Sequence, residues 1–117
     1  MALEQTDKVD FISISRQTAD VKLTLVDALD WTNERHHLTL LQDKINAYLS
    51  FIESGEIDRV YPSGIGRQRL INIVARYKPT AAGLVFLDRI RLLVEGAGFG
   101  FHFSVRHDLA KDDEAKE

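Results

Sequence analysis

Two short stretches near the N-terminus alternate between apolar and polar residues. Residues 9–15 and 21–26 are rich in β-branched and aromatic side chains, and residues 16–20 between them are polar. In the second stretch, every second residue is apolar, and Lys22 and Thr24 stand between. A period of two is typical of a strand with one buried face and one solvated face. The pattern therefore predicts a β-hairpin.

The spacing becomes helical in residues 32–53. Apolar residues recur there at steps of three and four, at Leu38, Leu41, Ile45, Tyr48, Leu49 and Ile52. Such spacing predicts an amphipathic helix. Thr32 or Asn33 can cap its start, and Gly55 suits a left-handed stop. Leu40 and Phe51 widen the apolar stripe, which leaves surface for a second contact.

Residues 56–68 contain Pro62, Gly64 and Gly66 and have no clear period, so we expect a loop of about a dozen residues. Residues 70–77 are almost continuously apolar, which predicts a central strand.

A second helix is expected to open at Pro79 and Thr80 and to run to about residue 95. Its core-facing row is Gly83, Leu87, Ile90 and Val94. Val85 and Leu92 lie outside this row, and a helix so apolar usually contacts something on more than one side. Residues 99–106 alternate again and predict a last strand with one buried face.

The order ββαβαβ predicts an α+β domain with two layers: a four-stranded mixed sheet and two helices on one face of it. We expect a flexible N-terminus at 1–8, one domain at 9–107 and a disordered acidic tail at 108–117. The opposite face of the sheet should then be solvated. The residues expected on it are Phe11, Ser13, Lys22, Thr24, Asn72, Val74, Arg76, His102, Ser104 and Arg106.

Composition excludes several classes of protein. The chain has no cysteine, so disulfides, thiolate catalysis and cysteine-ligated metals are excluded. No apolar run approaches the roughly 20 residues that cross a bilayer, and residues 1–10 do not resemble a secretory signal. We therefore expect a cytoplasmic protein. The net charge is −3, yet residues 60–107 hold seven bases and two acids, an excess of +5 that can form a basic patch. The favoured reading is a mixed surface, because an α+β fold interleaves its two halves in space.

Several segments resemble a family of small bacterial proteins that is defined only as a domain of unknown function. The matching segments are LTLVD at 23–27, DW at 30–31, LTLLQDKINAYLSFIESG at 38–55 and YKP at 77–79. The resemblance covers most of residues 9–105. It implies no activity or cofactor, because the shared residues look structural.

Two glycine-rich segments invite comparison with phosphate-binding loops. A phosphate loop needs a strand, a glycine turn and then a helix, whereas at residues 96–100 a helix precedes and a strand follows. We interpret these glycines as a helix stop. Residues 63–67 lie between Arg59 and Arg69 and could hold an anion, but they lack the Lys-Ser/Thr ending of a P-loop. A flexible loop is the other reading.

Histidines and carboxylates offer further candidates. His36 and His37 are adjacent, so on a helix they diverge by about a hundred degrees and do not readily share a metal. We expect them to be solvent-exposed or capping. Asp27, Asp30 and Glu34 could bind a cation or perform acid–base chemistry. Helix capping beside a Trp31 that covers the core is the favoured reading, so we predict no catalytic residue, metal or cofactor.

The pattern as a whole predicts a non-catalytic protein-interaction module that forms a homodimer and binds an unidentified protein partner on the open sheet face. The expected interface residues are Leu40, Phe51, Val85 and Leu92. The alternative is a module that binds a small anionic ligand. The residues proposed for ligand or partner binding are Arg67, Arg69, Arg76, His102 and Arg106. Nucleic acid is not expected, because the phenylalanines of the last strand belong in the core.

Overall fold

Four strands form one mixed sheet in the computed structural model, which describes residues 10–106. The strands are β1 (Phe11–Ile14), β2 (Val21–Asp27), β3 (Arg69–Ala75) and β4 (Gly100–Val105). They lie side by side in the order β1-β2-β3-β4. β1 is antiparallel to β2, and β2, β3 and β4 are parallel to one another. The predicted flexible N-terminus (1–8) and acidic tail (108–117) lie outside the described residues.

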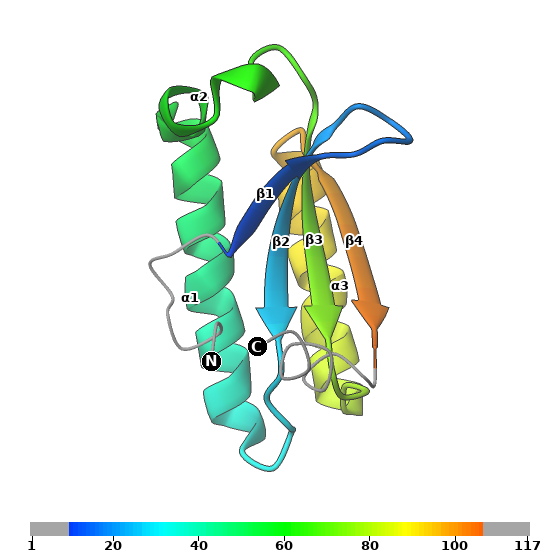
Figure 1. Ribbon diagram of the computed structural model, residues 1–117. Helices are drawn as coiled ribbons and strands as arrows, with labels where there is room; N and C mark the ends of the chain where they lie inside the picture. The colour runs from blue at the N-terminus through cyan, green and yellow to red at the C-terminus, as the bar shows by residue number, and fades with distance from the viewer. Residues whose placement is uncertain (1–9, 107–117) are drawn as a thin grey trace.

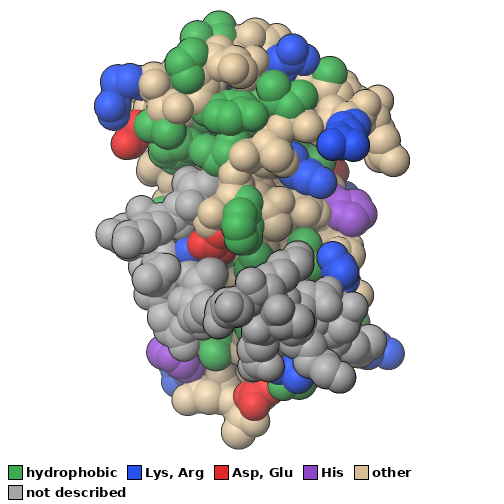
Figure 2. Space-filling view, viewed as in Figure 1, with side chains coloured by type: hydrophobic (Ala, Val, Ile, Leu, Met, Phe, Trp, Pro, Cys, Tyr) green, Lys and Arg blue, Asp and Glu red, His purple; other side chains and the backbone are tan. Residues whose placement is uncertain are grey.

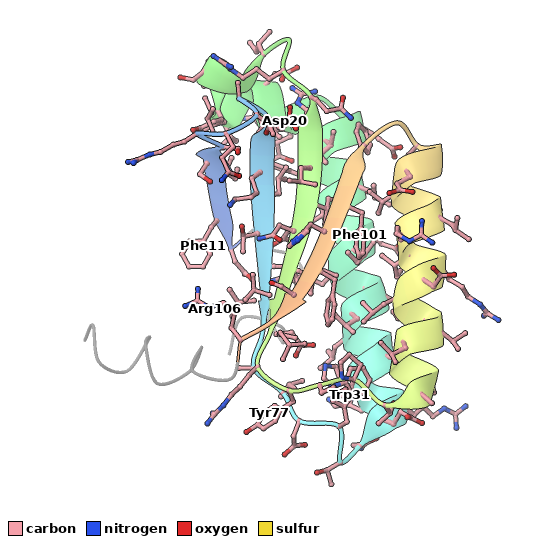
Figure 3. The ribbon with its side chains drawn as sticks, turned by 90° about the vertical axis from the view of Figure 1, so that its right-hand side faces the viewer. Phe11, Asp20, Trp31, Tyr77, Phe101 and Arg106 are labelled. Carbon is pink, nitrogen blue, oxygen red and sulfur yellow. The ribbon has the colours of Figure 1, made fainter. Side chains whose placement is uncertain are left out.

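Two long helices cover the same face of this sheet (Figure 1). α1 (Glu34–Glu53) lies on the side of β1 and β2, and α3 (Ala81–Gly96) lies behind β3 and β4. The side view shows the sheet as one layer and the helices as a second layer (Figure 3). The prediction of an α+β fold with the order ββαβαβ and both helices on one face is confirmed.

Both long helices begin at side-chain caps that the sequence indicates. The side chain of Asn33 accepts a hydrogen bond from the backbone N–H of His36 at the start of α1. The hydroxyl of Thr80 accepts one from the N–H of Gly83 at the start of α3. These bonds satisfy donors that the first helical turn leaves without partners. Gly55 takes the left-handed conformation after α1, with φ at 85°.

The prediction of a loop at residues 56–68 is wrong. This segment holds a short helix, α2 (Glu56–Val60), and a 3-10 turn, η2 (Pro62–Gly64). Ile57 is only 1% exposed and fixes α2 to the core. A five-residue helix needs one buried residue and therefore shows no period, which explains why the pattern gave no sign of it.

The core lies between the sheet and the helices. It is formed by inward-facing residues of β2 and β3 together with the apolar stripes of α1 and α3. Its most buried members are Val21, Leu23, Leu25, Leu41, Ile45, Tyr48, Ile71, Ile73 and Val94. Phe101 points from β4 toward the helices, whereas Phe11 and Arg106 point away from them (Figure 3). The opposite face of the sheet is therefore the open face that the alternation predicts.

Candidate functional site

One row of side chains crosses the open face from edge to edge. Phe11, Thr24, Asn72 and His102 are register partners on the four successive strands. The Asn72 amide donates to the Thr24 hydroxyl over 3.4 Å, and its oxygen lies 3.0 Å from Nδ1 of His102. Because an amide oxygen only accepts, Nδ1 of His102 is the donor. In the neutral ring, Nε2 is then the acceptor on an exposed side chain.

Asn72 departs from the expectation of a solvated residue. It points to the open face, yet it is only 8% exposed. Its neighbours in the row, Thr24 and His102, bond to it from both sides. A buried amide is stable when such partners satisfy it. Asn72 therefore joins β2 to β4 through side chains and orients the His102 ring.

The ionisable residues that point to the open face from the described strands, or follow β3 and β4 directly, are of the basic types. They are Lys22, Arg76, His102 and Arg106. Lysine and arginine side chains and a histidine lie toward the β4 side in Figure 2. Arg76 lies over the ring of Tyr77, with 5.2 Å between the guanidinium carbon and the ring centroid. Lys22 and Arg76 therefore place positive charge on this face.

The five residues proposed for ligand binding do not meet at one place. Arg67 and Arg69 lie near the start of β3, and Arg76 follows its end, about 20 Å away for seven residues of extended chain. Arg67 donates to the carbonyls of Ser63 and Ala19, and Arg69 pairs with Asp58 of α2. These two arginines hold the η2 segment, the hairpin turn and α2 together. Arg76, His102 and Arg106 remain grouped on the open face.

A buried aspartate and histidine face each other where β2 leads into α1. Nε2 of His37 lies 2.5 Å from Oδ2 of Asp27, and the two residues are 1% and 2% exposed. Nδ1 of His37 lies 2.9 Å from the carbonyl oxygen of Asp30. Since that oxygen only accepts, Nδ1 carries a hydrogen, and the bond to Asp27 requires a second proton between the two side chains. The expectation of an exposed or capping His37 is therefore wrong.

Trp31 covers the Asp27–His37 pair. Its ring stacks on the ring of His37 with centroids 3.8 Å apart. On the far side it meets α3, because a β-carbon at Gly83 would lie 2.8 Å from the indole. Glu34 bonds to the hydroxyl of Thr80, which caps α3. The expected reading of Trp31 as a cover on the core fits this geometry, and the cluster fixes the start of α1 against the start of α3.

A second buried ion pair, which the sequence analysis missed, ties β1 to α1. Nζ of Lys44 lies 2.9 Å from Oδ1 of Asp10, and Oδ2 of Asp10 accepts from the N–H of Val26. The Tyr48 hydroxyl accepts from the N–H of Asp10 and donates to the carbonyl of Thr24. Burial raises the pKa of Tyr48. The signal in the sequence was Lys44 itself, a charged residue inside the apolar stripe of α1.

The outward face of α3 carries exposed apolar side chains beside the charged residues Asp88, Arg89 and Glu95. Leu84, Val85, Leu92 and Leu93 are 49–58% exposed. Of the four predicted interface residues, Val85 and Leu92 belong to this surface. Leu40 and Phe51 of α1 are half-buried and pack against the core. The structure thus divides the predicted interface between an exposed part on α3 and a largely covered part on α1.

Among residues 10–106 there is no group of three or more histidine, aspartate or glutamate side chains that could hold a metal ion. None of the helices in this part of the chain is both long and apolar enough to span a membrane.

These observations define a small two-layer α+β protein. It has an Asp–His pair buried beneath Trp31, basic side chains on the open sheet face and exposed apolar side chains on α3. A family model described as a family of unknown function, DUF6572, matches residues 1–107. The chain belongs to this family. No curated protein and no solved structure shows significant similarity to it.

Proposed function

We propose that this protein is a non-catalytic interaction module that associates with a second copy of itself through the outer face of α3. The observation that carries the proposal is the exposure of Leu84, Val85, Leu92 and Leu93 on one helix. Val85 and Leu92 are seven residues apart, which places them about two turns apart on one line of the helix. Leu84 and Leu93 flank this line on opposite sides of the helix, because nine residues at about 100° each end half a turn apart. Exposed apolar side chains such as Val85 and Leu92 favour protein contacts.

The charges on α3 favour a second copy as the partner. Asp88 and Glu95 are balanced by Arg89 and Arg91, so the exposed part of the helix has no net charge. Arg91 already pairs with Asp88 and Glu95 on its own helix, at 2.5 and 3.2 Å. Two such surfaces do not repel each other. An antiparallel pair of α3 helices related by a two-fold axis would place Val85 of one copy against Leu92 of the other.

The burial of the Asp27–His37 pair supports the non-catalytic part of the proposal. These two side chains are the strongest acid–base candidates in the described chain, and they are 1–2% exposed beneath Trp31. A general base must come within hydrogen-bond reach of a substrate proton. A pair that is buried in this way stabilises the packing of the core and does not contact a substrate.

Light scattering after size-exclusion chromatography tests the self-association. We expect a dimer at tens of micromolar, and a monomer for the double variant Val85→Lys/Leu92→Lys. Each apolar side chain that leaves an interface costs roughly 1.5–3 kcal/mol, so the dissociation constant should rise at least about a hundredfold.

The matched control is Val60→Lys/Ile65→Lys, which changes two apolar residues of similar exposure outside α3. This control should remain dimeric, and circular dichroism should show that both variants are folded. A wild-type protein that is monomeric throughout this concentration range would refute the proposal.

A further inference from the structure

Within residues 10–106, β4 is an edge strand whose sequence lacks the residues that usually protect such edges. It pairs with β3 on one side and has no second neighbour among the described strands. Its sequence, GFHFSV, contains no proline, lysine or acidic residue. Natural edge strands commonly carry these residues, are very short, or are covered. β1, at the other edge, is four residues long, and the N–H of Asp10 before it is bonded to Tyr48.

The inner side of β4 has apolar surface that another strand would cover. Phe101 points toward the helix layer, as Figure 3 shows, and Phe103 shares its side of β4, because the two are register partners of the core residues Ile71 and Ile73; both are only partly buried. Both side chains pack against the core and remain partly accessible. A strand added at this edge would bury apolar side chains against them.

The outer side of the same edge is basic. His102 and Arg106 lie on β4 or directly after it, and Arg76 follows β3 beside them. A strand added next to β4 would direct every second side chain toward these groups. Its apolar side chains would then face Phe101 and Phe103, and its acidic side chains would face the open side.

We propose that an acidic, extended segment of a partner protein binds to the β4 edge as a fifth strand, with alternating acidic and apolar side chains. Main-chain hydrogen bonds to the strand supply affinity, and the alternation supplies specificity. Charge complementarity with the Arg76 guanidinium, beside the hydrogen-bonding side chain of His102, selects an acidic partner. This site is separate from the outer face of α3 and does not depend on self-association.

The open face suits a peptide better than single-stranded nucleic acid. Bases bind to sheets by stacking on aromatic side chains. The two central strands present Thr24, Val26, Asn72 and Val74 there, none of which is aromatic. Of the two exposed aromatic rings on this side, Phe11 lies at the β1 edge, three strands away from β4, and Tyr77 lies beyond the end of β3 with the Arg76 guanidinium over it.

The probe for this proposal is a fluorescent ten-residue peptide of alternating glutamate and valine. Fluorescence anisotropy should show binding at low salt that weakens as salt is added. A peptide with lysine in place of glutamate should not bind. Equal binding of both peptides would overturn the proposal, and so would tighter binding of a ten-nucleotide oligothymidine, which would make the face a nucleic-acid surface.

Substitutions locate the peptide on the protein. Arg76→Glu should weaken binding roughly three- to tenfold, as expected for reversing one exposed charge. Arg35→Glu makes the same charge change at an exposed position of α1 and should leave the affinity unchanged. If both variants weaken binding equally, the attraction is non-specific and the proposal is wrong.

Backbone chemistry separates strand addition from simple charge attraction. N-methylation of the peptide amides that face β4 should abolish binding, whereas methylation of the alternate amides should be tolerated. Equal effects of the two methylated peptides would contradict strand addition. The Val85→Lys/Leu92→Lys variant should bind the peptide as the wild type does, so failure of the α3 proposal is distinguishable from failure of this one.

Discussion

At the scale of single residues, the main feature is the burial of polar groups in matched sets. His37 bonds to Asp27 and to the Asp30 carbonyl, and Lys44 bonds to Asp10. Burying one charged member of such a pair alone would cost several kcal/mol. The sets are therefore structural constraints, because each partner makes the burial of the other possible.

Removing His37 should destabilise the protein strongly. His37→Leu leaves the Asp27 carboxylate buried without its partner, and we expect the free energy of unfolding in urea to fall by about 3–5 kcal/mol. The double variant Asp27→Leu/His37→Leu should recover part of this loss, because no buried side-chain charge then remains unpaired, although the Leu29 N–H and the Asp30 carbonyl lose their partners. His36→Leu, at the exposed neighbouring position, should change stability by less than about 0.5 kcal/mol. Equal losses in the two single variants would show that the buried pair has no special role.

At the scale of elements, α3 packs closely against Trp31 in the loop before α1. This contact restricts the size of the side chain at position 83 of the helix. Gly83 lies in the first turn of α3, where Trp31 and Pro79 leave no room for a side chain. Gly96, at the end of the same helix, has open space around the position of a β-carbon. The two glycines therefore meet different constraints within one helix.

Alanine substitutions at these glycines should have opposite effects. Alanine is favoured over glycine in a helix by about 1 kcal/mol, so Gly96→Ala should be neutral or stabilising. At Gly83 the new methyl group would lie 2.8 Å from the indole of Trp31, and overpacking should outweigh the helical gain by about 1–3 kcal/mol. Thermal unfolding followed by circular dichroism measures both. A melting temperature for Gly83→Ala at or above that of the wild type would disprove the clash.

At the scale of the whole molecule, the two layers are held together by the core and by the polar set at Asp10, Lys44 and Tyr48. The Tyr48 hydroxyl spans from α1 to the backbone of Asp10 and Thr24. The Tyr48 side chain is buried, so a negative charge on its oxygen would destabilise the folded state. The stability of the protein at alkaline pH is therefore linked to this residue.

The sign of this linkage follows from the raised pKa of Tyr48. Below pH 10, near the ordinary tyrosine pKa, the hydroxyl is neutral in both states and its contribution is complete. Above pH 10 the unfolded chain loses this proton while the folded protein keeps it, so the free energy of unfolding falls as pH rises. Ultraviolet titration should show that one of the three tyrosines ionises only as the protein unfolds, and that this phase is absent in Tyr48→Phe. Ionisation of all three tyrosines in the folded protein would contradict the prediction.

The elements and the assignment of faces could be predicted largely from the sequence. Alternation in residues 21–26 and 99–106 gave the strands and their open side, and the caps at Asn33 and Thr80 gave the helix starts. The short helices in residues 56–68 could not be predicted, because they contain too few residues to show a helical period. Arg76 and Arg106 follow the ends of the parallel strands β3 and β4, whereas Arg67 precedes β3. This separation depends on strand direction, which composition does not contain.

What the sequence by itself determined is local: where strands and helices form, and which side of each is apolar. These properties depend on residues a few positions apart, through the periods of two and 3.6. Only the tertiary structure decided which polar residues meet, because Lys44 reaches Asp10 across 34 positions and Asn72 reaches His102 across 30. Such contacts depend on strand order, register and helix placement. These are set by packing of the whole chain and not by the pattern around any one residue.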